Sequence, residues 1–179
     1  MLANQISQAK VILQHGGVIA YSTETILGLG CDPRNKNAVN RLLWLKNRAV
    51  VEGLILLVNS SQAMSCFTQP LTAAQISKIE STQNTTWLVP PHAAIPKWII
   101  GKHQRLAVRI TNHPIAHSLS AVMGGIVSSS ANMSGYKTLC SNKEIKNWFG
   151  PHLDYVIIGE PGTGLPSSIH DLLTGKKLR

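Results

Sequence analysis

The chain has 179 residues, a formal net charge of +9 and a sequence pI near 9.8. Hydrophobic residues make up 44% of it and charged residues 14%, which excludes a disordered chain and indicates a globular protein. One domain usually takes roughly 100–200 residues, so we expect a single domain over residues 1–179. The excess of Lys and Arg is spread along the chain. It favours polyanionic partners such as nucleic acid, nucleotide phosphates or anionic lipid, although it also fits a basic composition that keeps proteins of the source proteome soluble.

The cysteines and the apolar runs bear on the compartment. Cys31, Cys66 and Cys140 are far apart and form no C-x-x-C pair, which fits free thiols used as small packing residues in a reducing compartment. The first residues lack the basic region and long apolar stretch of a signal peptide. The longest apolar runs, such as residues 54–58, are far too short to span a bilayer. We therefore expect a cytoplasmic protein with no membrane partner.

Hydrophobic periodicity and turn residues predict short helices and strands that alternate along the chain. In chain order we expect a helix over residues 5–14 that ends at Gly16-Gly17, a strand over 18–21, a helix over 37–46 with Asn37 as its N-cap, a strand over 54–58, a helix over 72–80, strands over 86–89 and 105–110, a helix over 114–123 with Pro114 in its first turn, a strand over 126–128, a helix over 141–149 and a strand over 155–158. This alternation is typical of an α/β domain, and the proline-rich stretch from 90 to 96 suggests a mixed sheet. The strand order does not follow from the pattern.

Several familiar motifs are absent. The chain has no G-x-x-x-x-G-K-[ST] phosphate loop, no G-x-G-x-x-G fingerprint and no G-x-S-x-G elbow. His113 and His117 are four residues apart with no glutamate between them, so they predict no zinc site. Only eight Asp and Glu residues are present, which leaves little scope for paired-carboxylate chemistry. Cations and hydroxyls remain, and these suit the binding of phosphates.

Three polar segments adjoin apolar elements, where ligand sites in α/β proteins usually lie. Residues 21–25, Y-S-T-E-T, could bind an amino acid or a phosphate, or could simply form a Ser/Thr turn. The cations of Lys46 and Arg48 could bind phosphate oxygens or cap a helix C-terminus. Residues 128–135, S-S-S-A-N-M-S-G, form a donor-rich loop for which we favour a functional role over a tight turn.

Together these segments resemble the YrdC/TsaC family of threonylcarbamoyl-AMP synthases. The most specific match combines Lys46-x-Arg48 with Ser130-x-Asn132 in the context S-A-N-M-S-G. The length is similar to that of the short, single-domain bacterial branch. The other matching segments are residues 18–25, 28–33, 53–56, 106–109 and 171–175.

The resemblance implies an α/β domain with a twisted mixed sheet flanked by helices and a basic concave face. It implies a nucleotidyltransferase that makes L-threonylcarbamoyladenylate from ATP, L-threonine and bicarbonate, with release of pyrophosphate, as the first step of threonylcarbamoyladenosine modification of tRNA. Mg²⁺ would travel with ATP. Further expected partners are tRNA or double-stranded RNA and a downstream threonylcarbamoyl-transfer complex.

The resemblance also assigns site residues. The catalytic tetrad, which would line the cavity and hold the ATP phosphates, is Lys46, Arg48, Ser130 and Asn132. Two more positions, Thr138 and Arg179, match residues near the nucleotide. The threonine pocket would comprise Thr23, Arg109, Ser128 and Ser167, with Arg109 on the substrate carboxylate. No metal-ligating residue is implied.

The chain departs from the family pattern in two places. The family often has Pro where this chain has Ser22, and its W-P-G-P-x-T stretch corresponds to residues 81–86, of which only Thr86 matches. Two alternative functions remain. One is an RNA-binding module, which the charge favours but the 5% aromatic content and the lack of an RRM, KH or OB signature do not. The other is a non-catalytic paralogue, which would bind ATP without forming product.

Overall fold

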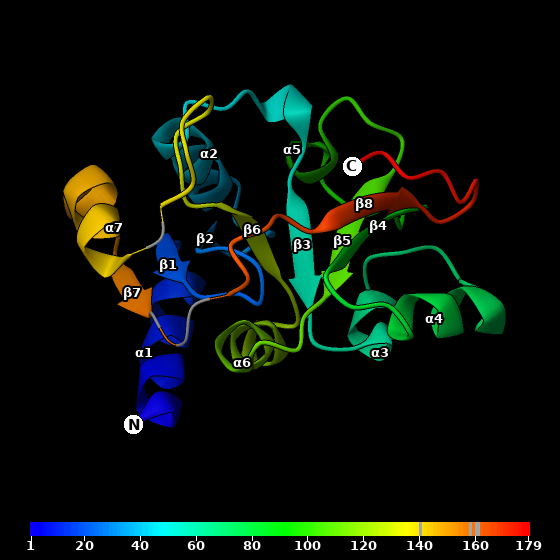
Figure 1. Ribbon diagram of the computed structural model, residues 1–179, viewed down its shortest axis with the longest axis horizontal. Coiled ribbons are helices and arrows are strands. Elements are labelled where there is room, and N and C mark those ends of the chain that lie inside the picture. Colours follow the sequence, from blue (N-terminus) through cyan, green and yellow to red (C-terminus); the bar gives the residue numbers. More distant parts are fainter. Residues whose placement is uncertain (140, 158, 160–161) are drawn as a thin grey trace.

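A computed structural model describes residues 1–139, 141–157, 159 and 162–179. The strands and helices alternate along the chain, as the sequence predicts (Figure 1). The strands are β1 Ile19–Tyr21, β2 Gly28–Gly30, β3 Ile55–Val58, β4 Thr85–Val89, β5 Leu106–Ile110, β6 Ile126–Ser130, β7 Tyr155–Ile157 and β8 Ser168–Asp171. The helices are α1 Leu2–Gln14, α2 Lys36–Leu45, α3 Ser61–Met64, α4 Ala73–Glu80, α5 Lys97–Ile100, α6 Pro114–Met123 and α7 Asn142–Phe149, with 3-10 turns at η1 Val50–Glu52 and η2 Gly150–His152.

These strands form one mixed sheet in the order β7-β1-β2-β6-β3-β5-β4-β8. The pairs β1–β7, β3–β5 and β4–β8 are parallel, and the other neighbours are antiparallel. The predicted α/β class with a mixed sheet is therefore confirmed. None of the helices in the described part of the chain combines the length and apolar composition that a bilayer crossing needs.

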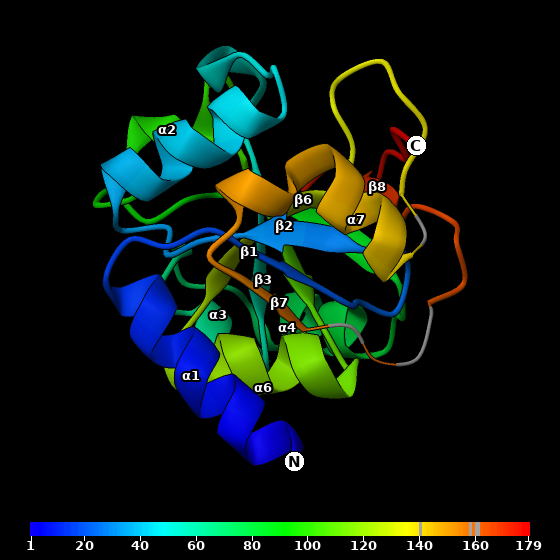
Figure 2. The ribbon, with the colours of Figure 1, turned by 90° about the vertical axis from the view of Figure 1, so that its left-hand side faces the viewer.

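The two faces of the sheet pack against different helices. Alternate residues of a strand point to opposite faces, so Leu56 and Val58 of β3 join the larger core with α2 and α5. On the other face, Leu57 packs with residues of α1 and α6, including Leu13 and Leu119. Figure 2 shows α1 and α6 on one side of the strands and α2 on the other. Neither α1 nor α6 extends over the whole of its face, and the uncovered end is where the site lies.

Helix ends follow the expected capping chemistry with one correction. The N-cap of α2 is Asn35, whose side chain accepts a hydrogen bond from the Ala38 backbone N–H, so the prediction of Asn37 was wrong. Asn35 is extended, whereas Asn37 already lies within the first turn. The α6 helix begins at Pro114 and ends at Gly124, which has a φ of 70°, as predicted.

The sequence patterns failed to predict two strands and predicted a third one too short. No strand was predicted over residues 28–30, yet they form β2 between β1 and β6. The half-polar segment Ser168–Asp171 forms β8 at the sheet edge. β6 continues through Ser130, so the predicted serine loop begins as strand. The predicted strand over 155–158 ends at Ile157 in the structure, and Ile158 lies outside the described residues.

The cysteine predictions have mixed outcomes. Cys31 is a buried free thiol in the larger core, as expected. Cys66 is exposed, so its prediction as a packing residue was wrong. It follows the short α3 helix in a surface turn, where it has no core to fill. Cys140 lies outside the described residues.

A substitution at Gly30 tests how closely β1, β2 and β6 approach one another. A Cβ on Gly30 would lie 2.6 Å from both Tyr21 Cε1 and the Val127 carbonyl oxygen. We expect Gly30→Ala to lower the free energy of unfolding by about 1–3 kcal/mol, because the fully buried neighbours must shift. Gly150→Ala is the matched control, since its Cβ would meet nothing closer than 3.9 Å, and we expect a change within about 1 kcal/mol. Urea unfolding measures both; equal stability of Gly30→Ala and wild type would contradict the packing described.

Candidate active site

A cavity of about 500 Å³ lies over the uncovered end of the sheet face. Its floor is a row of paired residues across four strands, because directly opposite residues share one face of a sheet. Ser128 of β6 pairs with Ile55 of β3, Ile55 pairs with Ala107 of β5, and Ala107 pairs with Leu88 of β4. All four residues line the cavity.

Most of the predicted site residues meet in this cavity, although they are far apart in sequence. The predicted residues that line it are Thr23, Arg48, Arg109, Ser128, Ser130, Thr138, Ser167 and Arg179. Two members of the predicted tetrad, Lys46 and Asn132, are not among the lining residues and lie behind the wall.

Three arginines with buried Nε atoms give the cavity its chemical character. In the part of the chain that the structure describes, the buried side-chain polar atoms without a hydrogen-bond partner are the Nε atoms of Arg48, Arg105 and Arg109. Each has a carboxylate oxygen nearby, at 3.5, 3.9 and 3.7 Å respectively, which is too long for a good hydrogen bond. All three arginines line the cavity. Buried donors without partners are rare in folded proteins, so this arrangement indicates a site for anionic ligands.

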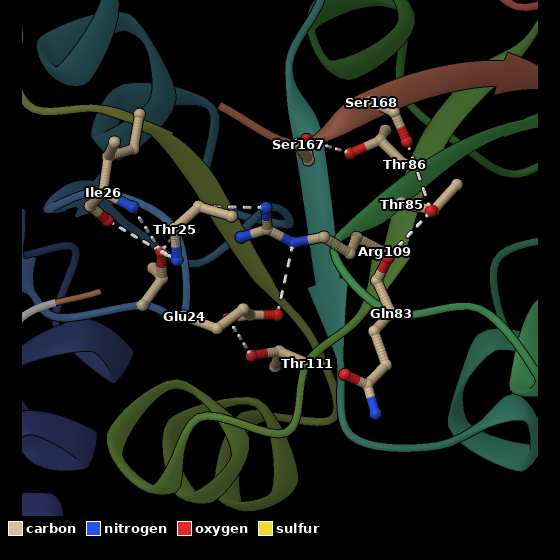
Figure 3. A network of polar contacts seen from close by, with 11 residues as sticks. Glu24, Thr25, Ile26, Gln83, Thr85, Thr86, Arg109, Thr111, Ser167 and Ser168 are labelled. Atoms are coloured by element: carbon tan, nitrogen blue, oxygen red, sulfur yellow. Dashed lines mark hydrogen bonds and ion pairs between the residues drawn. The ribbon is translucent and has the colours of Figure 1, made fainter. Parts of the chain in front are cut away.

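Arg109 extends from β5 toward the Thr23–Thr25 turn (Figure 3). It is 4% exposed, and its Nη1 donates a hydrogen bond to Thr25 Oγ1 at 3.3 Å. Glu24 lies beside it and accepts a hydrogen bond of 2.9 Å from Thr111 Oγ1. Burial lowers the pKa of the Arg109 guanidinium, and the charge of Glu24 opposes that shift. Arginine stays protonated in proteins, so Arg109 presents a fixed positive fork to the cavity.

The turn that carries Thr23 is fixed by its own hydrogen bonds and by a distant segment. Thr23 Oγ1 donates to the Ile26 carbonyl at 2.7 Å. The backbone N–H groups of Thr163 and Gly164 donate to the carbonyls of Glu24 and Thr25, at 3.0 and 2.7 Å. In Figure 1 the segment that leads to β8 passes in front of β6 and β3. The turn is thus fastened to a segment that spans the cavity.

Lys46 connects α2 to the serine-rich segment. It is 2% exposed, and its Nζ donates to the carbonyls of Ser130 and Asn132 and, at 3.4 Å, to Asn132 Oδ1. Ser130 Oγ donates to Asn132 Oδ1 at 2.5 Å, and the Ser134 N–H donates to the Lys46 carbonyl at 2.8 Å. Three members of the tetrad are therefore interlocked, with Ser130 at the cavity surface and the other two behind it.

The fourth member, Arg48, faces the cavity. Its Nη2 donates to the Gly53 carbonyl at 2.9 Å, and its Nε lies 3.5 Å from Glu52. Burial lowers the pKa of Lys46 from 10.5 to about 8; the nearby charge of Arg48 lowers it too, and Glu52 opposes both. The two cations therefore lie close enough for one to affect the protonation of the other.

The segment that departs from the family pattern lies outside the cavity wall. Residues 81–86, all of which the structure describes, connect α4 to β4, and none of them lines the cavity. Thr86, the matching residue, is fully buried and forms a 2.8 Å hydrogen bond with Ser167 Oγ, which does line the cavity. The effect of this segment on the site thus passes through Ser167.

The sequence reasoning missed several lining residues, of which Arg105 is chemically the most important. The strand predicted over 105–110 contained a signal for it, because residues 105, 107 and 109 of such a strand would share one face. In the structure β5 begins at Leu106, and Arg105 directly precedes it. Glu24 and Glu52, the carboxylates beside Arg109 and Arg48, carried no comparable signal, since isolated acidic residues are usually solvated.

Comparisons with known proteins found relatives by sequence and by structure. The Sua5_yciO_yrdC family model, described as "Telomere recombination", matches residues 11–179. A protein of Nitrosococcus oceani named threonylcarbamoyl-AMP synthase is 40% identical over 179 residues, covering 98% of this chain and 97% of the relative. One of Pseudomonas fluorescens with the same name is 38% identical over 178 residues, covering 98% and 96%.

Among solved structures, P. abyssi Sua5 complexed with L-threonine matches with a TM-score of 0.88 and 26% identity. The match covers 96% of this chain and 52% of the Sua5 chain, so this chain spans about half the length of that protein. Sequence and structure agree over nearly the whole chain: it belongs to the Sua5/YciO/YrdC family.

Proposed function

We propose that this protein is an L-threonylcarbamoyladenylate synthase, which joins L-threonine, bicarbonate and ATP and releases pyrophosphate. The observation that carries the proposal is one cavity lined by three arginines whose buried Nε atoms have no hydrogen-bond partner. The reaction requires a site that holds two anionic substrates side by side. The names of the full-length relatives and the threonine complex of Sua5 support the same activity.

The end of the cavity around Arg109 suits the amino acid. A guanidinium fork matches the geometry of a carboxylate, and the Nε of Arg109 has no other hydrogen-bond partner. The hydroxyls of Thr23, Ser128 and Ser167 lie in the same cavity and can accept from or donate to the amine and hydroxyl of threonine. Glu24 and Thr111 hold Arg109 from behind.

The end around Arg48 and Ser130 suits the triphosphate. Once the threonine amine has taken up carbon dioxide or bicarbonate, the new carboxylate oxygen attacks the α-phosphorus, and pyrophosphate leaves. No covalent protein intermediate is needed, so the protein acts by positioning two anions and by offsetting the charge that builds on the phosphoryl oxygens. Arg48 and Ser130 contact the phosphates, while Lys46 and Asn132 fix the loop that presents Ser130. Thr138 and Arg179, which also line the cavity, would contact the nucleotide.

Magnesium would enter with ATP. Within the described residues, no group of three His, Cys, Asp or Glu side chains is placed to hold a metal ion. Phosphate oxygens and water would therefore supply most of the ligands, as is usual for Mg²⁺ on nucleotides. The bound ion would help to neutralise the departing pyrophosphate.

The proposal also covers the partners of the protein and its location in the cell. The product is a precursor for tRNA modification, so the acceptor would be a downstream threonylcarbamoyl-transfer complex in the cytoplasm. The +9 charge favours contact with tRNA or double-stranded RNA.

The direct test of the function is a product assay. Purified protein is incubated with ATP, magnesium, L-threonine and bicarbonate, and pyrophosphate release is followed together with the adenylate by mass spectrometry. We expect both products, and neither when threonine is left out. A folded protein that binds ATP and forms no adenylate would contradict the proposal and favour the non-catalytic paralogue, and steeply salt-dependent RNA binding without ATP turnover would favour the RNA-binding module.

Arg48→Ala tests the phosphate end. We expect adenylate formation to fall roughly 10²-fold or more, which is what loss of one preorganised charge-stabilising donor costs. The control is Arg34→Ala, which removes an arginine paired with Asp32 outside the cavity and should leave turnover near that of the wild type. Steady-state kinetics measure both, and a folded Arg48→Ala protein with wild-type turnover would remove Arg48 from the site.

The lowered pKa of Lys46 predicts that ATP binding depends on pH. With a pKa of about 8, Lys46 is a cation below that pH and neutral above it. The neutral amine has lost a positive charge near the phosphates and one donor to the Ser130–Asn132 loop, so ATP affinity should fall as pH rises from about 7 to about 9. Calorimetry without threonine measures the affinity. Lys46→Met should bind ATP more weakly and with little pH dependence, and an equal pH dependence in both proteins would contradict the assignment.

A further inference from the structure

We propose that Arg105 is a further phosphate-binding residue, which holds the pyrophosphate half of the triphosphate from the side of the cavity opposite Ser130. The inference rests on the proposed function for the identity of the ligand. It goes beyond that function because Arg105 lies outside the tetrad and the threonine pocket.

The strand directions of the sheet bring Arg105 to the phosphate end. Ile55 pairs with both Ser128 and Ala107. β3 and β5 run parallel to each other and β3 runs antiparallel to β6. Gly53, which precedes β3, and Arg105, which directly precedes β5, therefore lie at the same edge of the sheet as Ser130, the last residue of β6. Gly53 is the residue whose carbonyl accepts the hydrogen bond from Arg48. Arg105 thus lies at the edge of the sheet where the proposed function places Ser130 and Arg48 on phosphate.

The same geometry separates Arg105 from the amino-acid end. Arg105 directly precedes β5, whereas Arg109 is the fourth residue of that strand and pairs with Leu57. Both line the cavity. The two guanidinium groups therefore enter the cavity from different points along β5, and Arg105 serves a second anion beyond the one on Arg109.

The guanidinium of Arg105 is held in place, yet its hydrogen-bonding capacity is largely unused. Its side chain is 33% exposed, and its buried Nε has no hydrogen-bond partner. The carboxylate of Asp171 is 3.9 Å away, and its Oδ1 already accepts from the backbone N–H groups of Leu173 and Thr174, at 2.9 Å each. The remaining contact of Arg105, from Nη1 to the Gln104 carbonyl, is 3.4 Å long. Asp171 thus orients Arg105 without saturating it.

Arg105→Gln tests the inference because it keeps a polar side chain of similar shape and removes the charge. We expect the KM for ATP and the inhibition constant for inorganic pyrophosphate each to rise roughly tenfold or more, the usual cost of one hydrogen bond to a charged group. The KM for threonine should change less than about twofold, because Arg109 remains. Arg105→Lys should recover part of the affinity as a point charge without the fork. Arg34→Gln controls for the loss of one arginine charge.

Calorimetry with pyrophosphate, in the absence of threonine, separates this inference from the proposed function. If the wild type makes adenylate and Arg105→Gln binds pyrophosphate as tightly as the wild type, the role of Arg105 is overturned and the function stands. If the wild type makes no adenylate but Arg105→Gln still loses pyrophosphate affinity, the function fails and the anion site stands. A lower unfolding midpoint with unchanged pyrophosphate affinity would make Arg105 only a structural partner of Asp171, and would also overturn the inference.

Discussion

The structure depends on arginine charge that is partly removed from water around one cavity. Removing a guanidinium from water costs several kcal/mol unless partners compensate, and here each of Arg48, Arg105 and Arg109 has one carboxylate at a distance that stabilises its charge without using up its donors. A closer ion pair would occupy up to two of the five N–H donors of each guanidinium, including its Nε–H. The loose pairs therefore keep the cations in place and leave their remaining hydrogen bonds to anions that enter the cavity.

The sheet sets where these arginines lie relative to one another. Because α1 and α6 cover only part of one face, the other end of that face stays open for ligands. Strand register then sets the spacing: Arg109 pairs with Leu57 of β3, whereas the Arg48–Gly53 contact lies four residues earlier in the chain, just before β3 begins at Ile55. The two anion sites are held apart by backbone hydrogen bonds, which deform less readily than loops. For a reaction between two bound substrates, the protein contributes mainly by holding them in the correct relative position.

Much of this could be predicted from the sequence, and the failures have physical causes. Periodicity identified the long helices and buried strands, because their apolar residues repeat at helical or strand spacing. It missed β2, whose glycines resemble a turn but are required by the close approach of Tyr21 to Gly30, and β8, whose polar residues lie at an edge. Resemblance assigned eight residues that do line the cavity. It could not reveal that Lys46 and Asn132 do not line the cavity, or that Arg105 does, since both facts depend on side-chain partners far away in the chain.

The measurement that tests the central claim most directly is a crystal structure of the protein with L-threonine and a non-hydrolysable ATP analogue. The claim is that one cavity holds two anions at separate arginines. We expect the threonine carboxylate on Arg109 and the triphosphate across the Arg48 and Ser130 end, with the threonine amine facing the α-phosphorus. A triphosphate bound outside this cavity, or a threonine carboxylate away from Arg109, would contradict it.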